Sequence, residues 1–120
     1  MADVVALIDD LFFQAKLIET AKQLGINLRI CGTPDAFLAE IGEHPPGLIV
    51  VDLNARSQPL EAVERLPAAA REIPVVAFLS HVQTDLAAKA RAAGCQEVIP
   101  RSLFTQNLAT ILARSKSQTS

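Results

Sequence analysis

The sequence contains no tryptophan and no tyrosine, and it has only two cysteines among its 120 residues. Cys31 and Cys95 are too few for a disulfide framework or for a zinc site built from cysteine ligands. We expect two half-buried thiols in a reducing compartment. No apolar run reaches the roughly 18 residues that span a bilayer, and no signal-like segment is present. These absences predict a cytoplasmic domain with no membrane partner.

An excess of charge of one sign is also missing. The chain has 11 Lys+Arg and 13 Asp+Glu residues, which give a net charge of −2 and a pI of about 5.6. Nucleic-acid-binding modules usually carry a basic stripe, so this balance argues against a nucleic-acid partner. The length suits one domain with its own core. We predict a single domain over residues 1–114 and a polar, disordered tail over residues 115–120.

The chain does contain apolar runs of strand length, separated by segments with helical spacing. The runs cover residues 4–8, 28–31, 48–51, 75–79 and 97–99. Three of them are continuous and rich in Val and Ile, which is typical of parallel strands covered on both faces. Helices are expected over residues 11–24, 34–41, 60–71 and 84–93 and in a last segment after 105. Thr33, Thr84 and Thr105 are the expected N-caps, and Gly25 and Gly94 are the expected C-terminal residues. Pro67 should either kink its helix or begin a new turn.

This alternation predicts an α/β fold, namely a flavodoxin-like (βα)5 doubly wound parallel sheet with strand order 2-1-3-4-5. In such a fold the functional crevice lies outside the carboxyl ends of the strands. The polar residues that follow the predicted strands are Asp9, Asp10, Asp52, Asn54, Ser80, His81, Arg101 and Ser102. Three carboxylates at one rim repel one another unless a cation lies among them, and oxygen ligands suit Mg²⁺. Such a site also suits phosphoryl transfer, which depends on positioning and charge neutralisation.

Four segments carry a resemblance to a known family. They are Val-Ala-Leu-Ile-Asp9-Asp10, Leu-Ile-Val-Val-Asp52, Pro74-Val-Val-Ala-Phe-Leu-Ser80 and Ala92-Ala-Gly-Cys-Gln-Glu-Val-Ile-Pro100. In this order and at these intervals they resemble the receiver domain of bacterial two-component response regulators, over nearly the whole chain.

The resemblance implies roles for these side chains. Asp52 would be the phospho-accepting residue and Ser80 the switch hydroxyl, while Asp9, Asp10, Asp52 and the backbone carbonyl of Asn54 would bind Mg²⁺. The donor would be a histidine kinase or a phosphotransfer protein, and the readout a downstream protein partner. The domain would not be an enzyme beyond self-phosphorylation and dephosphorylation at Asp52. We expect a stand-alone module that signals by protein contact, as a monomer or weak homodimer.

Two positions depart from the family pattern. Receivers carry a lysine after the fifth strand, where this chain has Arg101, and an aromatic residue three positions earlier, where it has Val98. Arginine keeps the charge, but its planar guanidinium favours bidentate pairing with carboxylates, so the exchange is not conservative. An alternative therefore stays open: a pseudo-receiver scaffold in which Arg101 pairs with Asp52 or with an acid of the first strand, and phosphorylation is lost.

Other residues also allow two interpretations. Asp9 and Asp10 bind metal or cap the following helix, and His81 is a reactive group or a solvated bystander. Of Phe12 and Phe13, either one is exposed as an anchor for a partner or both are packed. An enzyme on the same fold is disfavoured, because the chain lacks a flavodoxin phosphate loop, a G-x-G-x-x-G motif and the Asp-x-Asp of haloacid dehalogenase-type phosphatases.

Overall fold

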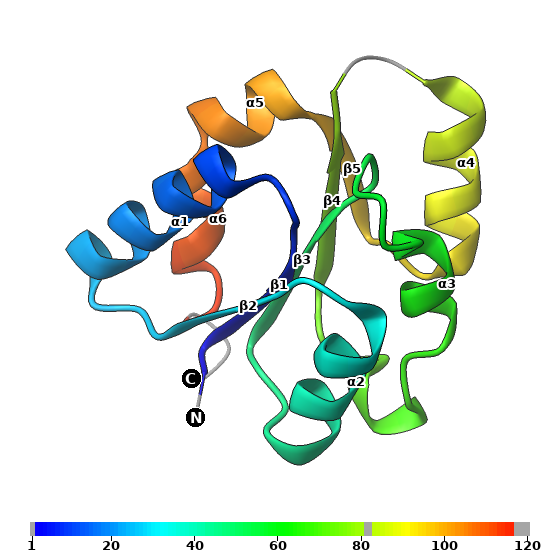
Figure 1. Cartoon of the computed structure of the whole chain (residues 1–120), viewed down its shortest axis with the longest axis horizontal. Coiled ribbons are helices and arrows are strands. Elements are labelled where there is room, and N and C mark those ends of the chain that lie inside the picture. The colour runs from blue at the N-terminus through cyan, green and yellow to red at the C-terminus, as the bar shows by residue number, and fades with distance from the viewer. Residues whose placement is uncertain (1, 81–82, 117–120) are drawn as a thin grey trace.

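The computed structural model describes residues 2–80 and 83–116 (Figure 1). The strands are β1 (Val4–Leu7), β2 (Leu28–Cys31), β3 (Leu48–Asp52), β4 (Val75–Leu79) and β5 (Glu97–Pro100). The helices are α1 (Leu11–Leu24), α2 (Pro34–Glu43), α3 (Pro59–Glu64), α4 (Thr84–Ala93), α5 (Arg101–Gln106) and α6 (Leu108–Ala113), and a 3₁₀ turn, η1 (Ala68–Ala70), follows α3. None of the helices in these two stretches is long and apolar enough to cross a membrane.

The five strands form one parallel sheet in the order β2-β1-β3-β4-β5, which confirms the predicted fold class and strand order. In the register, Leu7 lies opposite both Cys31 and Val51, and Asp52 lies opposite Phe78. The strands β1, β3 and β4 are buried along their whole length, as their continuous apolar sequences predict. Because the strands are parallel and in register, their carboxyl ends meet at one edge.

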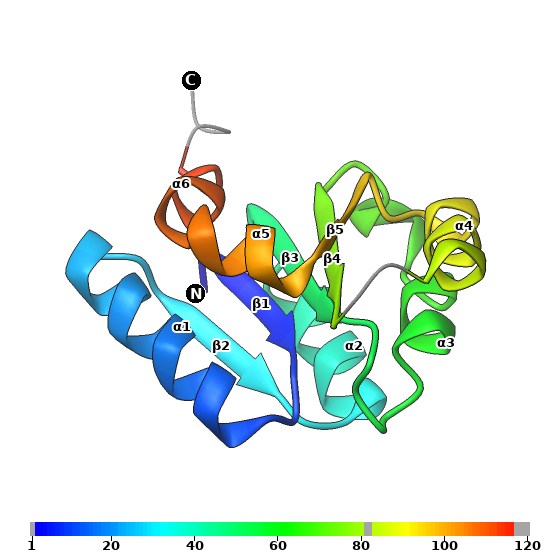
Figure 2. The ribbon, with the colours of Figure 1, turned by 90° about the horizontal axis from the view of Figure 1, so that it is seen from above.

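Helices cover both faces of the sheet, with α1, α5 and α6 on one side and α2, α3 and α4 on the other (Figures 1 and 2). Successive strand residues point to opposite faces, so the core is divided into two clusters. One contains Phe13, Phe78 and Phe104 together with residues of α1 and α6. The other contains Phe37 and Val98 together with residues of α3 and α4.

The first two helices begin where their capping residues predict, and α1 also ends at the predicted Gly25, whereas α2 continues to Glu43, beyond the predicted end at Ile41. The Thr33 hydroxyl accepts a hydrogen bond from the N–H of Ala36, and Gly25 ends α1 in the left-handed region at φ 68°. At the start of α1, the Asp10 carboxylate accepts hydrogen bonds from the N–H groups of Phe12 and Phe13. The capping interpretation of Asp10 is therefore confirmed.

Two of the predicted N-caps are wrong, and the structure decides between the two alternatives for Pro67. Thr84 is not an N-cap: Gln83 holds that position, without a side-chain hydrogen bond to the helix. Thr105 is not one either, because α5 already begins at Arg101, after Pro100 with φ −62°. Pro67 begins a new turn, since it is the N-cap of η1 and α3 has already ended at Glu64.

Both cysteines are buried, at 4% exposure each, rather than half-buried as predicted. Burial raises the pKa of the Cys31 thiol and raises the pKa of the Cys95 thiol to about 11. A thiol is reactive as the thiolate, so these side chains act as small apolar residues of the core.

Ser115 and Lys116, the last described residues, pack against the segments that precede β1 and β3. Ser115 is buried. A Cβ atom at position 47 would overlap the backbone carbonyl oxygen of Ser115, so only glycine fits there. Lys116 Nζ lies 3.4 Å from the Asp3 carboxylate. The remainder of the predicted tail, residues 117–120, lies outside the described residues.

Candidate functional site

The polar residues that follow β1, β3 and β5 meet at the carboxyl edge of the sheet. Arg101 Nη1 lies 3.4 Å from Asp10 Oδ2, and Arg101 Nη2 lies 3.3 Å from Asp52 Oδ2. One guanidinium therefore bridges the carboxylates of two strand ends. We call the group of acids formed by Asp9, Asp10 and Asp52 the acidic pocket, and the chain itself places a cation beside two of its members.

Aromatic rings determine where this guanidinium lies. Its central carbon is 5.0 Å from the ring centroid of Phe13 and 5.5 Å from that of Phe78, which is within the range of cation–π attraction. Phe104 stacks on Phe78 with a centroid distance of 4.5 Å, so the rings form one packed cluster. Arg101 Nε is buried and has no hydrogen-bond partner among the described residues. The side chain is thus held by its rings and by the two carboxylates.

Asp52 is the most buried of the acids, with 3% of its side chain exposed. Its Oδ1 accepts a hydrogen bond of 2.9 Å from the N–H of Asn54, and its Oδ2 faces Arg101. Burial raises the pKa of Asp52, and the hydrogen bond from Asn54 and the charge of Arg101 offset only part of that effect. Both carboxylate oxygens are therefore already engaged within the protein.

The acids of the β1–α1 segment are also engaged. Asp9 Oδ2 accepts a hydrogen bond of 2.9 Å from the N–H of Arg56, which ties this segment to the β3–α3 segment. Asp10 uses Oδ1 to cap α1 and Oδ2 to contact Arg101. The negative charges of both residues add to the raised pKa of Asp52. The predicted acidic cluster thus assembles at one edge.

Asn54 contributes its side chain as well as its backbone. Its Oδ1 accepts a hydrogen bond from the N–H of Ser80, and its Nδ2 donates one of 3.0 Å to Gln83 Oε1. Sequence reasoning gave Asn54 a role only through its backbone carbonyl and missed Gln83, because no motif marks a glutamine that stands just before a helix. His81, the other predicted candidate after β4, lies outside the described residues.

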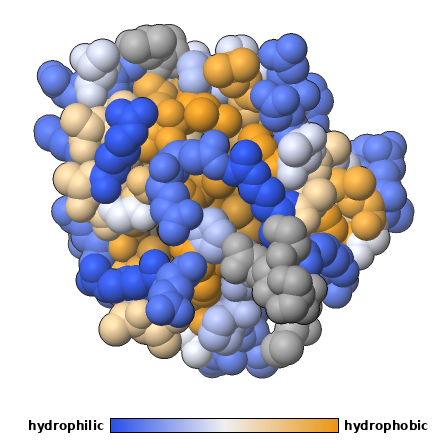
Figure 3. Space-filling view, turned by 180° about the vertical axis from the view of Figure 1, so that it is seen from behind, coloured by the Kyte–Doolittle hydropathy of each residue, from blue (hydrophilic) through white to orange (hydrophobic). Residues whose placement is uncertain are grey.

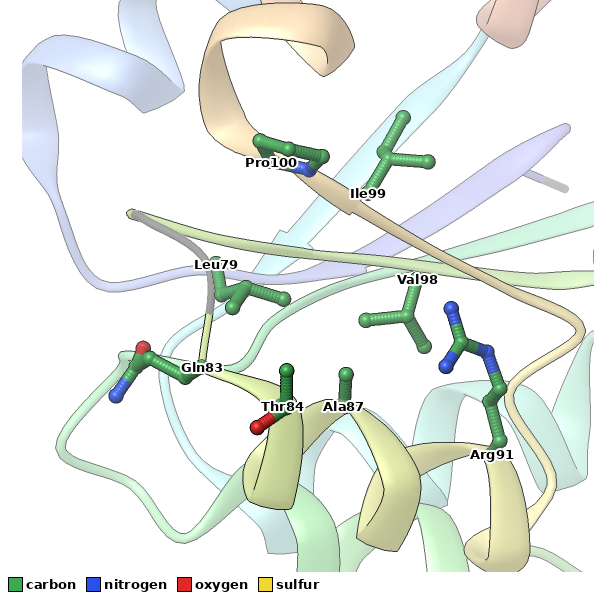
Figure 4. Close-up of a pocket in the computed structure, with 8 residues that line it drawn as sticks. All are labelled: Leu79, Gln83, Thr84, Ala87, Arg91, Val98, Ile99 and Pro100. Atoms are coloured by element: carbon green, nitrogen blue, oxygen red, sulfur yellow. The ribbon is translucent and has the colours of Figure 1, made fainter.

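Val98 lies beside a hollow of about 200 Å³ between α4 and β5. Figure 4 shows its side chain directed toward α4, with Ala87 and Leu79 nearby and Gln83 and Arg91 at the sides. The hollow is smaller than the roughly 300–1,000 Å³ of typical small-molecule sites. Figure 3 shows the molecule from behind, where apolar patches lie among hydrophilic side chains.

The two adjacent phenylalanines point to different environments. Phe13 is 7% exposed and packs under Arg101, whereas Phe12 is 91% exposed and its neighbour Leu11 is 76% exposed. Two consecutive helical residues differ by about 100° in direction, so they cannot both face the core. The interpretation in which one ring is exposed is confirmed, and that ring stands at the start of α1 beside the acidic pocket.

Comparison with known proteins identifies the architecture. No protein-family model and no curated protein matches this chain. Among solved structures, the receiver domain of Francisella response regulator 1452 has a TM-score of 0.82 at 14% identity and covers 100% of both chains. The Brucella abortus NtrX receiver domain has a TM-score of 0.80 at 21% identity, over 98% of this chain and 100% of that one. The chain has the fold of response-regulator receiver domains.

A third structure supports this receiver fold, and longer proteins contain it as one part. CheY4 of Vibrio cholerae matches with a TM-score of 0.81 at 18% identity, over 96% of this chain and 98% of that one. The chain spans only 26–28% of the longer NtrX chains that it also matches. At such identities the likeness concerns the fold and not the chemistry of the site.

Magnesium does not fit this receiver-type pocket in the arrangement described above. The outward oxygens of Asp10 and Asp52 face a guanidinium, and their other oxygens accept backbone N–H groups. Across residues 2–80 and 83–116, no group of three or more His, Cys, Asp or Glu side chains is arranged to hold a metal ion. Arg101 already places one positive charge against two of the three carboxylates, those of Asp10 and Asp52.

Proposed function

We propose that this chain is a receiver-type signalling module that works by protein–protein contact, and that the Arg101 guanidinium takes the place of a metal ion in its acidic site. The receiver fold supports a role in phosphorelay signalling. The observation that carries the proposal is the guanidinium that bridges Asp10 and Asp52 above the ring of Phe13. Under this proposal the domain is a pseudo-receiver scaffold, the alternative based on Arg101, and Asp52 is not phosphorylated.

The contacts of Asp52 support this proposal. A carboxylate that attacks a phosphorus centre needs a free oxygen and neutralised charge around it. Here one oxygen of Asp52 accepts the N–H of Asn54 and the other faces Arg101, so neither is directed freely toward solvent. A buried, paired carboxylate is also costly to separate from its partner. The pair therefore favours one fixed conformation of the pocket.

The exposed ring of Phe12 supports contact with a protein partner. Large aromatic side chains are enriched among the residues that dominate binding energy in protein interfaces. Phe12 and Leu11 project from the first turn of α1, which the Asp10 carboxylate caps. We propose this turn as the anchor for a signalling protein, with a histidine kinase, a phosphotransfer protein or a downstream partner as the candidate classes.

A phosphorylated receiver is the second candidate. It is favoured by the position of Asp52 at the end of β3, opposite Phe78, with Ser80 two residues further along the β4 segment. The side chain of Arg101 is 32% exposed, so it has room to withdraw toward solvent. In that case Asp52 would accept the phosphoryl group and Ser80 would follow it.

Exposure of the protein to acetyl phosphate and Mg²⁺, followed by intact-mass spectrometry, distinguishes the two candidates. We expect no added phosphate on the native chain, because Arg101 occupies the approach to Asp52. Arg101→Lys keeps the charge but removes the planar bridge, and it is the matched variant; Asp52→Ala is the control for the labelled residue. If native Asp52 takes up as much phosphate as the Arg101→Lys variant does, the pseudo-receiver proposal is wrong and the chain is a phosphorylated receiver.

A further inference from the structure

The hollow of about 200 Å³ between α4 and β5 has apolar walls from three elements. Ala87 of α4 faces Val98 of β5, and Leu79, at the end of β4, points into the same space (Figure 4). Ile99 and Pro100 extend the apolar lining along β5. Leu79 and Val98 are buried, so the inner end of the hollow is shielded from solvent. The space remains because an alanine on the helix faces only a valine on the strand.

The volume of the hollow restricts what can enter it. An apolar cavity of about 150 Å³ holds one benzene molecule. Ligands of drug size need sites of roughly 300–1,000 Å³. The hollow therefore has room for a single benzene-sized ring and for little more, which excludes a nucleotide, a flavin or a haem as its occupant.

A positive charge stands at one end of this apolar space. Arg91 of α4 lines the hollow, and Figure 4 shows its guanidinium beside Val98. The Arg91 side chain takes part in none of the ion pairs between described residues. A guanidinium binds a carboxylate well, because its planar fork donates two parallel hydrogen bonds. The hollow thus combines a ring-sized apolar space with a group that recognises a carboxylate.

The surface around the hollow favours a free small molecule over a protein as the occupant. Among the described residues, the large apolar side chains that stay exposed lie on α1 and α5, and none lies on α4 or β5. The exposed positions of α4 include Thr84, Asp85 and Lys89. Protein interfaces place large side chains at their centre and deplete lysine and aspartate there, so this rim is unlike an interface core.

We propose that the hollow between α4 and β5 is a binding site for a small aromatic carboxylate, with the ring between Ala87 and Val98 and the carboxylate on Arg91. The inference goes beyond the proposed function, because no residue of the acidic pocket lines this hollow. It holds for a pseudo-receiver and for a phosphorylated receiver alike.

Amide NMR spectra of the full chain, recorded during titration with benzoate, test the site. Benzoate is expected to shift the signals of Ala87, Arg91 and Val98 to a saturating value. Two further titrations separate the contributions of ring and charge. Benzyl alcohol keeps the ring without the charge, and acetate keeps the charge without the ring, so each should bind at least about ten-fold more weakly than benzoate.

Two variants make the test specific to this hollow. Arg91→Met removes the guanidinium from an exposed position and should weaken benzoate binding about ten-fold, with no change for benzyl alcohol. Arg71→Met removes an exposed guanidinium that does not line the hollow, and this matched control should bind benzoate as the native chain does. Ala87→Leu places additional carbon atoms in the hollow and should abolish the binding of both ring compounds.

Several results would refute the site. The proposal is wrong if benzoate leaves Ala87 and Val98 unmoved, if benzyl alcohol binds as tightly as benzoate, or if Arg91→Met and Arg71→Met bind benzoate equally. It is also wrong if the same signals shift with protein concentration in the absence of benzoate, because a second copy of the chain then occupies the hollow. Phosphorylation of native Asp52 would overturn the proposed function and leave the benzoate titration untouched, because that titration uses unmodified protein.

Discussion

The two sides of the acidic pocket differ in the interactions that hold them. Toward α1 and α5, the rings of Phe13, Phe78 and Phe104 lie 4.5–5.7 Å apart and hold the Arg101 guanidinium. Toward α4, Ala87 faces Val98 across a hollow of about 200 Å³. Packing therefore fixes the cation of the pocket, whereas hydrogen bonds fix the helix on the other side.

The largest effect is expected on the aromatic side. Phe78→Ala should lower the free energy of unfolding by about 3–5 kcal/mol, because the ring is fully buried and stacks on Phe104. Urea unfolding followed by circular dichroism measures the change. Phe12→Ala removes the same ring from an exposed position and should stay within about 0.5 kcal/mol of the native chain. Equal effects at the two positions would contradict the packed aromatic cluster.

Loss of the cation is expected to have the next largest effect. Arg101→Met leaves the Asp52 carboxylate buried and without its partner, and removing one partner of a fully buried pair costs about 3–5 kcal/mol. Because the Arg101 side chain is 32% exposed, we expect a smaller loss of roughly 1–3 kcal/mol near pH 7. The same urea experiment measures it, and an unchanged stability would show that Arg101 does not neutralise the pocket.

The effect of Arg101→Met should also depend on pH. Burial raises the pKa of Asp52, so this group favours folding below its unfolded-state pKa, and the contribution is lost as the pH rises through the folded-state pKa. Without Arg101 that pKa rises further, and the loss of stability should grow as the pH rises above the ordinary aspartate pKa of about 4. Adding Asp52→Asn should abolish the growth; a loss independent of pH would point to packing instead.

The smallest effect is expected at the hollow. Val98→Leu adds one methylene where there is space and should change the free energy of unfolding by less than about 1 kcal/mol. Ala6→Val also enlarges a side chain, but Ala6 is fully buried in the cluster that contains Phe13 and Phe78, and it should cost about 1–3 kcal/mol. Comparable costs at both positions would mean that α4 is packed as tightly as the aromatic side.

The fold could be predicted from the sequence because its signals are local. Continuous Val and Ile runs at β1, β3 and β4 indicate strands covered on both faces, and the βα alternation then limits the strand order. The caps Thr84 and Thr105 were wrong because a cap depends on backbone geometry around it: Gln83 and Pro100 precede the helices that those threonines were expected to start. Residue type alone does not decide between neighbouring start positions.

The candidate site could be predicted only in part. Carboxylates after β1 and β3 had to meet Arg101 after β5 once the sheet was parallel and in order. The bridge to both Asp10 and Asp52 depends on the rings that seat the guanidinium, and neither ring contact has a sequence signature. The hydrogen bond between Asn54 and Gln83 joins residues 29 positions apart on exposed segments, where no periodic pattern operates.

The ion pair between Lys116 and Asp3, together with the close contact of Ser115 and Gly47, has a practical consequence. Both described ends of the polypeptide leave the body near each other, at the amino-terminal end of the sheet (Figure 1). A fluorescent label or an immobilisation tag attached at either end would therefore stand clear of Phe12 and Arg101. Immobilised protein can present its acidic rim to other molecules without obstruction, and a circularly permuted version is a realistic way to move the attachment point.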